Sequence, residues 1–218
     1  KTLLYGINRD LGPLDTWLDD IKVAVEGTSF NLHWQDAVFP VFVPLHGRPV
    51  LSNLLAAFTM ACALGADAQY VAGAIRNIEP VSNRLEVRKY DGYVQINDAY
   101  NANPVGFSAA LEVLEQLPGE RKILVTPGMI ELGAQQESEN EKAGQLAARV
   151  CELVFVVGTV NQEPLCRGLE RGGMAKENIR CFAHRDLALS ELNAGRKKGD
   201  VILLENDLPD LFEMELRW

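Results

Sequence analysis

Residues 93–117 read YVQINDAYNANPVGFSAALEVLEQL, and this stretch changes from one kind of secondary structure to another. The run Tyr93–Asn97 predicts a strand. Asn103-Pro104 then supplies a helix N-cap followed by proline at the first helical position. In the helix that follows, apolar residues recur on one side: Phe107, Ala110, Leu111, Leu114 and Leu117. The stretch therefore predicts a strand, a polar loop and an amphipathic helix in sequence, which is the repeating unit of an α/β fold.

The same alternation continues toward the C-terminus. Four further strands are predicted, with helical stretches between them, at Lys122–Thr126, Leu153–Val157, Ile179–Phe182 and Val201–Glu205. The run from Val154 to Val157 is apolar at every position, which is typical of a parallel strand covered on both faces. Asp91-Gly92 predicts a hairpin turn between Leu85–Tyr90 and the strand at Tyr93. Residues 83–218 are therefore predicted to form an α/β domain with a mostly parallel sheet.

The N-terminal part has a different pattern. Alternating and β-branched residues predict antiparallel strands at Lys22–Glu26, Ser29–Trp34 and Val38–Leu45, with a hairpin turn at Gly27-Thr28. A pair of helices is predicted next, at Ser52–Leu64 and Gln69–Ile78, with Asp67 as the N-cap of the second. Because Pro80 closes this pair, residues 1–82 are predicted to form a first domain that ends before residue 83.

Composition and charge exclude several classes of protein. The chain has 218 residues, a net charge of −9 and a hydrophobic fraction of 47%, which is ordinary for a soluble globular protein. Its basic cluster, Arg196-Lys197-Lys198, is short and suits the C-terminal end of a helix, so no nucleic-acid partner is expected. No window approaches the roughly 18 apolar residues of a membrane helix. Residues 1–6 show no signal-peptide pattern and are expected to form a strand. The scattered cysteines indicate a reducing compartment, so we expect a cytoplasmic location.

The cysteines give no sign of a metal site or a disulfide framework. They are Cys62, Cys151, Cys166 and Cys181, and no two of them form a C-x-x-C pair. Three dispersed histidines add no metal-ligand spacing. Cys62, Cys151 and Cys181 have apolar neighbours and are expected to behave as small core residues.

Candidate functional residues lie where strands are predicted to end. The carboxyl ends of parallel strands carry the functional loops of such sheets, which selects residues 98–103, 127–133 and 206–210. Asp98 follows a strand, where a carboxylate can accept two hydrogen bonds from a ribose diol. The alternative is turn chemistry, for which Asp and Asn are common. The chain contains no G-x-x-x-x-G-K-[ST], no G-x-G-x-x-G and no G-x-S-x-G, which argues against a stand-alone phosphate-loop enzyme, a dehydrogenase or a serine hydrolase.

Five segments, in order, resemble the Mur ligase family. Residues 97–104, NDAYNANP, resemble the D-S-Y-N-A-N-P segment of the family members that add D-alanyl-D-alanine. The other four are SNLLAA (52–57), EPVSNRLEV (79–87), GMIELG (128–133) and GDVILL (199–204). The resemblance implies the end of a central ATPase domain followed by a Rossmann-like C-terminal domain. In this family ATP phosphorylates the carboxylate of a UDP-linked muramyl peptide, and an amine attacks the acyl phosphate to form an amide.

The resemblance also implies roles for individual residues. Asn53 would contact the adenine of ATP and Asp98 its ribose, while Arg84 would reach the terminal phosphates across the domain cleft as the catalytic residue. The substrate-side loops would carry Asn101, Asn103, Glu131 and Asn206. The cofactors would be ATP and Mg²⁺, with the metal ligands and the phosphate-loop lysine upstream of Lys1, so the 218 residues alone are expected to be inactive. The partners would be small molecules, namely a nucleotide, a UDP-linked peptide and an amine or dipeptide; the oligomeric state stays open.

Departures from the family pattern leave alternatives open. Pro49-Val50 replaces a His-Asn pair, Pro127-Gly128 lacks the aspartate of G-D-M, and Glu205-Asn206-Asp207 replaces K-G-S. From the residues alone, Arg84 could be a surface arginine paired with Glu86, Asn53 a polar residue near a helix start, and residues 206–210 a capped loop. The substrate could also be that of a folylpolyglutamate, cyanophycin or lipid II amidating relative, since residues 103–107 also resemble the N-P-x-G-F stretch of the lipid II amidating subunit. A non-catalytic interaction module is the remaining alternative.

Overall fold

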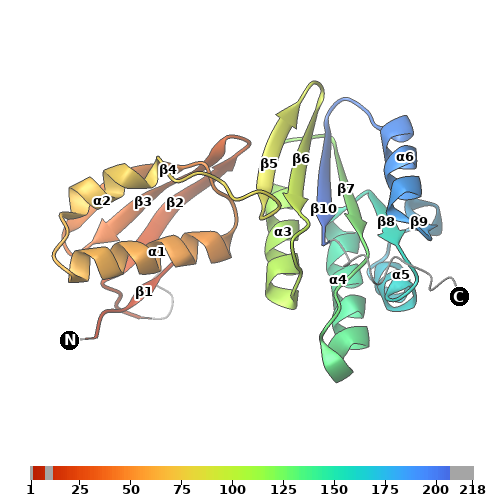
Figure 1. Ribbon diagram of the computed structural model, residues 1–218, viewed down its shortest axis with the longest axis horizontal. Helices are drawn as coiled ribbons and strands as arrows, with labels where there is room; N and C mark the ends of the chain where they lie inside the picture. The colour runs from red at the N-terminus through yellow and green to blue at the C-terminus, as the bar shows by residue number, and fades with distance from the viewer. Residues whose placement is uncertain (1, 8–11, 207–218) are drawn as a thin grey trace, which may run out of the picture. The chain divides into compact units, whose positions relative to one another are not determined.

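The chain forms two compact units in a computed structural model that describes residues 2–7 and 12–206 (Figure 1). The first unit is Lys1–Val81 and the second is Ser82–Trp218. Within these described residues, no helix combines the length and apolar character that crossing a bilayer requires.

The first unit is a four-stranded sheet covered by two helices. Its strands are β1 (Tyr5–Gly6), β2 (Thr16–Ala24), β3 (Gly27–Trp34) and β4 (Ala37–Val43), in that spatial order. β2, β3 and β4 pair antiparallel, whereas β1 pairs parallel with β2. The helices α1 (Arg48–Ala63) and α2 (Ala68–Ile75) supply the other half of the core. The buried apolar side chains are Leu18, Phe30, Leu32, Val41, Val43, Leu51, Leu54, Leu55, Phe58, Ala72 and Ile75.

Two predicted boundaries in the sheet of this unit were wrong. β2 begins at Thr16 instead of Lys22. The register of its pairing shifts after Asp19, and Asp20 has a φ of 48°, so the alternation of apolar and polar residues that indicates a strand is interrupted there. The first hairpin turns at residues 25–26, because Gly27 already pairs with Ala24. A Cβ atom at Gly27 would lie 2.2 Å from the Val43 carbonyl oxygen, which explains the glycine there.

The predicted helix bounds of this unit also differ from the structure. α1 begins at Arg48, four residues before the predicted start, because Pro49 is tolerated in the first turn of a helix. α2 ends at Ile75, three residues before the predicted end. It begins at Ala68, one residue before the predicted start, and its predicted N-cap is confirmed: the side chain of Asp67 accepts a hydrogen bond of 2.8 Å from the Tyr70 backbone N–H.

The second unit confirms the predicted α/β class with a mostly parallel sheet. Its strands lie in the order β5 (Glu86–Tyr90), β6 (Tyr93–Asp98), β10 (Asp200–Glu205), β7 (Arg121–Thr126), β8 (Leu153–Val157) and β9 (Ile179–Phe182). The β5–β6 hairpin is antiparallel and the other pairs are parallel. β10 therefore enters the sheet between two strands that come much earlier in the chain (Figure 1).

Helices cover both faces of this sheet. α6 (Arg185–Gly195) packs through Ala188 and Leu192 against alternate strand residues that include Val125, Phe155 and Ile202. The other strand residues, such as Leu124 and Leu203, are equally buried. The remaining helices are α3 (Pro104–Gln116), α4 (Gln136–Val150) and α5 (Gln162–Arg171), and each packs against the next. Short 3₁₀ turns occupy Gly133–Gln135 and Lys176–Asn178.

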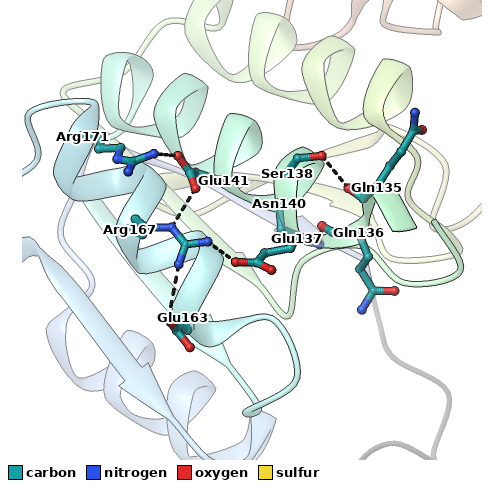
Figure 2. A network of polar contacts seen from close by, with 9 residues as sticks. All are labelled: Gln135, Gln136, Glu137, Ser138, Asn140, Glu141, Glu163, Arg167 and Arg171. Atoms are coloured by element: carbon teal, nitrogen blue, oxygen red, sulfur yellow. Dashed lines mark hydrogen bonds and ion pairs between the residues drawn. The ribbon is translucent and has the colours of Figure 1, made fainter. Parts of the chain in front are cut away.

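Helices α4 and α5 approach each other very closely. A Cβ atom at Gly168 of α5 would lie 2.1 Å from the carbonyl oxygen of Glu141 on α4. Beside this contact, Arg167 bonds to three carboxylates, Glu141 at 2.7 Å, Glu137 at 2.5 Å and Glu163 at 3.3 Å, as Figure 2 shows. Arg171 bonds to Glu141 as well. The glycines permit the close packing, and the arginines link the two helices along their exposed side.

Two remaining predictions concern exposed groups. The cluster Arg196-Lys197-Lys198 follows the end of α6, as predicted, and the guanidinium carbon of Arg196 lies 4.0 Å from the centre of the Tyr93 ring. The prediction that Cys181 is a core residue was wrong, because it is exposed on the edge strand β9. Cys151 is buried, and Cys62 is half-buried.

Candidate active site

Two carboxylates end neighbouring strands at the carboxyl edge of the six-stranded sheet. Asp98 is the last residue of β6, and it pairs in register with Glu205, the last residue of β10. The Asp98 Oδ1 atom accepts a hydrogen bond of 3.0 Å from the Leu85 backbone N–H. Burial raises the pKa of Asp98, while this hydrogen bond and the positive charge of Arg84 act in the opposite direction. A half-buried carboxylate with unused acceptor capacity therefore lies at the strand end that the sequence selected.

Glu205 is the more buried member of this pair. Its side chain is 0% exposed, and within residues 2–7 and 12–206 neither of its carboxylate oxygens has a hydrogen-bond partner. Burial and the neighbouring Asp98 charge raise the pKa of Glu205 well above its ordinary value. When both side chains are ionised, each has only hydrogen-bond acceptors and they cannot bond to each other. When one of them is protonated, its O–H can donate a hydrogen bond to the other. The pair therefore favours a state that holds one proton.

Arg84 and Tyr100 lie on the solvent side of this pair. The guanidinium carbon of Arg84 is 4.2 Å from the centre of the Tyr100 ring, and both side chains are exposed. The Tyr100 N–H also donates to the Asn83 carbonyl over 3.2 Å. The alternative in which Arg84 pairs with Glu86 is wrong, because Glu86 binds Arg88 at 2.8 Å. The structure thus brings Arg84 toward Asp98 and stacks it on an aromatic ring.

Three asparagines hold the neighbouring loop, residues 127–133. Asn140 accepts from the Met129 N–H and donates to the Met129 carbonyl, each over 2.8 Å. Asn161 donates to the Pro127 carbonyl over 3.0 Å, and Asn206 donates to the Gly128 carbonyl over 2.6 Å. The sequence analysis missed Asn140 and Asn161, which are almost completely buried. For Asn140 the available signal was a polar residue on the otherwise apolar buried face of α4, whereas Asn161 directly precedes α5.

Gly128 is required by this arrangement. Its φ is 79°, and a Cβ atom there would lie 2.4 Å from the Asn140 side-chain oxygen. The loop that replaces the G-D-M pattern of the family is therefore fixed by its backbone groups.

A small cavity opens at the same edge, on the α6 side of the sheet. Its volume is about 200 Å³, and its floor is apolar, with Val125, Val157, Leu189 and Leu204 among the lining residues. The polar lining residues are Arg185, Asp186 and Asn206. The cavity thus combines an apolar floor with one cationic and one anionic side chain.

The other predicted site residues fall into different environments. Asn103 caps α3, with its side-chain oxygen accepting from the Gly106 N–H over 2.9 Å, and Asn101 is exposed in the loop before it. Glu131 is exposed at a φ of 64° in the 127–133 loop. Asn53 is an exposed residue of the other unit, inside α1 and not at its start. Residues 207–210 of the predicted third loop lie outside the described part of the chain.

Comparison with known proteins identifies the family. The family described as "Mur ligase, glutamate ligase domain" matches residues 83–205, which is more than half of the chain. The chain belongs to the Mur ligase family. Among curated Mur ligases, the UDP-N-acetylmuramoyl-tripeptide–D-alanyl-D-alanine ligase of Bacillus subtilis is 29% identical over 213 residues, covering 93% of this chain and 46% of that protein. The ligase of the same name from Escherichia coli is 33% identical over 141 residues, covering 64% of this chain and 31% of that protein. The chain thus spans less than half the length of these relatives.

Solved Mur ligase structures share the fold. The MurF ligase of Thermotoga maritima, solved in complex with ADP, superposes with a TM-score of 0.79 at 24% identity, covering 95% of this chain and 45% of that protein. MurF of Acinetobacter baumannii gives a TM-score of 0.75 at 22% identity over 88% of this chain. The α/β architecture of a Mur ligase C-terminal domain is therefore shown, together with the helices and strands that precede it.

Proposed function

We propose that the complete protein is an ATP-dependent amide-forming ligase of peptidoglycan precursor synthesis, which joins D-alanyl-D-alanine or a similar amine to a UDP-linked muramyl peptide. In this proposal residues 1–82 are the end of its central ATP-binding domain and residues 83–218 are its C-terminal domain. The observation that carries the proposal is that Asp98 accepts a hydrogen bond of 3.0 Å from the backbone of Leu85, the residue after Arg84, at the carboxyl edge of a Mur ligase C-terminal domain. The names of the similar curated ligases supply the substrate class.

The residues at this edge fit a nucleotide. The Asp98 carboxylate uses one acceptor site for Leu85 and has others for the hydroxyls of a ribose. Arg84 presents a planar fork of donors that suits phosphate oxygens, and Tyr100 supports its aliphatic and guanidinium surfaces. ATP would supply the phosphoryl group that activates the substrate carboxylate. Asp98 would orient the nucleotide, and Arg84 would stabilise negative charge that develops on the transferred phosphoryl oxygens.

The cavity beside α6 fits the amine substrate. Arg185 and Asp186 offer opposite charges for the carboxylate and ammonium ends of a zwitterion, and the apolar floor suits small methyl side chains. A volume of about 200 Å³ is below the usual range of roughly 300–1,000 Å³ for drug-sized ligands, which favours a ligand as small as a dipeptide. Asn206 lines the cavity and also fixes the 127–133 loop, so the two parts of the site share a support.

The proposed Mg²⁺ site has no counterpart among the described residues. In residues 2–7 and 12–206, no group of three or more His, Cys, Asp or Glu side chains is gathered as a metal site. We propose that the Mg²⁺ ligands and the phosphate-loop lysine belong to sequence upstream of residue 1. We therefore expect the 218 residues alone to turn over no ATP, and activity tests require the complete protein.

Substitutions at Asp98 and Arg84 test the proposed function in the complete protein. Asp98→Ala should raise the KM for ATP by roughly 30-fold or more, because two charge-assisted hydrogen bonds of about 1.5–3 kcal/mol each are lost in part. Arg84→Ala should mainly lower kcat, because the guanidinium is proposed to stabilise the negative charge that develops on the phosphoryl oxygens in the transition state. Steady-state kinetics of phosphate release separate the two effects.

Ser82→Ala is the matched control, since Ser82 is exposed in the same segment and should behave as wild type. If Asp98→Ala and Arg84→Ala both match this control, the nucleotide assignment is wrong. If these substitutions impair ATP use but the wild type prefers glutamate to D-alanyl-D-alanine as the amine, a folylpolyglutamate-type relative is supported instead. Complete absence of ATP turnover in the full-length wild type would support the non-catalytic module.

A further inference from the structure

Two cysteines that are far apart in the sequence meet on one face of the second unit. Cys166 lies on α5 and Cys181 on the edge strand β9, and their sulfur atoms are 3.5 Å apart. Cys181 is exposed, whereas Cys166 is half-buried. Both belong to the same compact unit, so this proximity does not depend on how the two units are arranged. Neither residue belongs to the carboxyl-edge site.

The register of β9 explains why the two sulfur atoms meet. Cys181 is paired with Val156 of β8, so its side chain lies on the same side of the sheet as that of Val156. The next residue, Phe182, stacks on Phe155 at 5.5 Å between ring centres, in the cluster that faces α6. Successive strand residues point to opposite faces, which leaves Cys181 on the face that α5 covers.

The helix that carries Cys166 is firmly attached. The neighbouring residue Arg167 bonds to Glu137 and Glu141 of α4 (Figure 2). Gly168 packs directly on the α4 backbone. Cys166 is therefore held at a fixed place, while Cys181 is accessible from solvent on β9, the edge strand of the sheet that the described residues form. A short movement of the side chains brings the sulfur atoms from 3.5 Å to the bond length of about 2.05 Å.

We propose that Cys166 and Cys181 form a thiol–disulfide exchange site that reacts with small-molecule disulfides. The exposed Cys181 meets the reagent first; as the thiolate it attacks one sulfur of the reagent disulfide and expels the other half as a thiolate. Cys166 then gives its proton to the expelled thiolate and attacks the Cys181 sulfur of the mixed disulfide, which releases the second half of the reagent as a thiolate that takes a proton from water. Two protein thiols are oxidised to one disulfide, and one reagent disulfide is reduced to two thiols.

The order of these two steps follows from the surroundings of the sulfur atoms. Burial raises the pKa of the Cys166 thiol to about 12, and the neighbouring Cys181 and Glu170 act in the same direction. Cys166 is consequently a poor first nucleophile and acts as the resolving residue. The product links α5 to β9 covalently, and β9 leads into the first turn of α6, where Arg185 and Asp186 line the cavity.

The 218-residue chain, reduced and then equilibrated with glutathione and glutathione disulfide at a series of ratios, tests this site. After alkylation of free thiols in denaturant, peptide mapping should show a cross-link between Cys166 and Cys181, with Cys62 and Cys151 alkylated. Hydrogen exchange of the β9 amides should slow by about tenfold or more in the oxidised form, because the link restricts local opening. Cys62→Ser, in the other unit, is the matched control and should give the same cross-link.

Single substitutions at the pair separate the two roles. Cys166→Ser should stop at a glutathione adduct on Cys181, and Cys181→Ser should leave Cys166 unmodified under the same conditions. Far-UV circular dichroism checks that both variants are folded, with Cys166→Ala as a second version of the first. The proposal is overturned if the wild type accumulates the adduct on Cys181 without the cross-link, or if no cross-link forms at any ratio.

Discussion

At the scale of single residues, Glu205 and Asp98 show how position in a sheet controls ionisation. Their places at the ends of paired strands put two acids side by side, and burial of Glu205 denies it the water that a carboxylate needs. The pKa of Glu205 in the folded chain is therefore raised above its unfolded value, and so is that of Asp98. Between the unfolded and folded pKa values the folded chain binds more protons, so these groups stabilise it at low pH and lose that contribution as pH rises through the folded pKa.

Glu205→Gln should remove the loss of stability that the wild type shows as pH rises. The amide keeps the shape of the side chain, carries no charge and can donate to Asp98. At pH 8 the variant should be more stable than the wild type by about 1–3 kcal/mol, the usual cost of an unsatisfied buried group, and the difference should shrink toward pH 4. Hydrogen exchange of the β10 amides in urea at several pH values measures this locally.

Glu205→Leu distinguishes the charge from the missing donor. It also removes the charge but gives Asp98 no hydrogen bond, so it should gain less than Glu205→Gln at pH 8. Equal pH dependence in the wild type and both variants would show that Glu205 is ionised without cost, and the shared-proton interpretation would then be wrong.

At the scale of elements, the close contact of α4 with α5 depends on glycine at the contact positions, where a side chain would not fit. Gly168→Ala should destabilise the second unit by about 1–3 kcal/mol, because the new methyl group would overlap the Glu141 carbonyl oxygen. This loss should appear although alanine favours helix over glycine by about 1 kcal/mol. Gly195→Ala in α6 is the control, since a Cβ atom there meets nothing within 4 Å and should be neutral or stabilising. Urea unfolding of both variants gives the comparison, and similar effects at the two positions would contradict the packing argument.

The elements of this chain differ in how far sequence alone determines them. β8 and β9 have the predicted bounds, and for β8 the reason is a continuous apolar run between polar turns, which leaves few alternatives. β2 was misread at its N-terminal half, where Asp19 and Asp20 interrupt the pattern at a register shift. At the site, Asp98 and Arg84 were selected from local motifs. The support of the neighbouring 127–133 loop by Asn140 and Asn161, and the meeting of Cys166 with Cys181, result from strand order, which no local pattern encodes.

At the scale of the whole molecule, each unit has its own sheet and its own buried core. Residues 76–84 connect them, and every one of these residues is exposed. Two of them, Arg76 and Arg84, are sites for trypsin. Limited proteolysis should therefore cut first at Arg76 or Arg84 and leave a resistant fragment that begins near Leu85. Mass spectrometry of the early products identifies the cut, and earlier cleavage inside residues 85–205 would contradict this division.

The central place of β10 has a consequence for synthesis of the protein. Asp200 pairs with Tyr93 on one side and with Arg121 on the other, so the strand that completes the sheet is made after both of its neighbours. While the ribosome is still producing α6, β6 and β7 each present an open edge of unpaired backbone groups, which is a template for wrong pairing. Non-local pairing of this kind also slows folding. The second unit should therefore acquire its native sheet only once Glu205 has left the exit tunnel, and until then a nascent chain of this protein is a natural client for a chaperone.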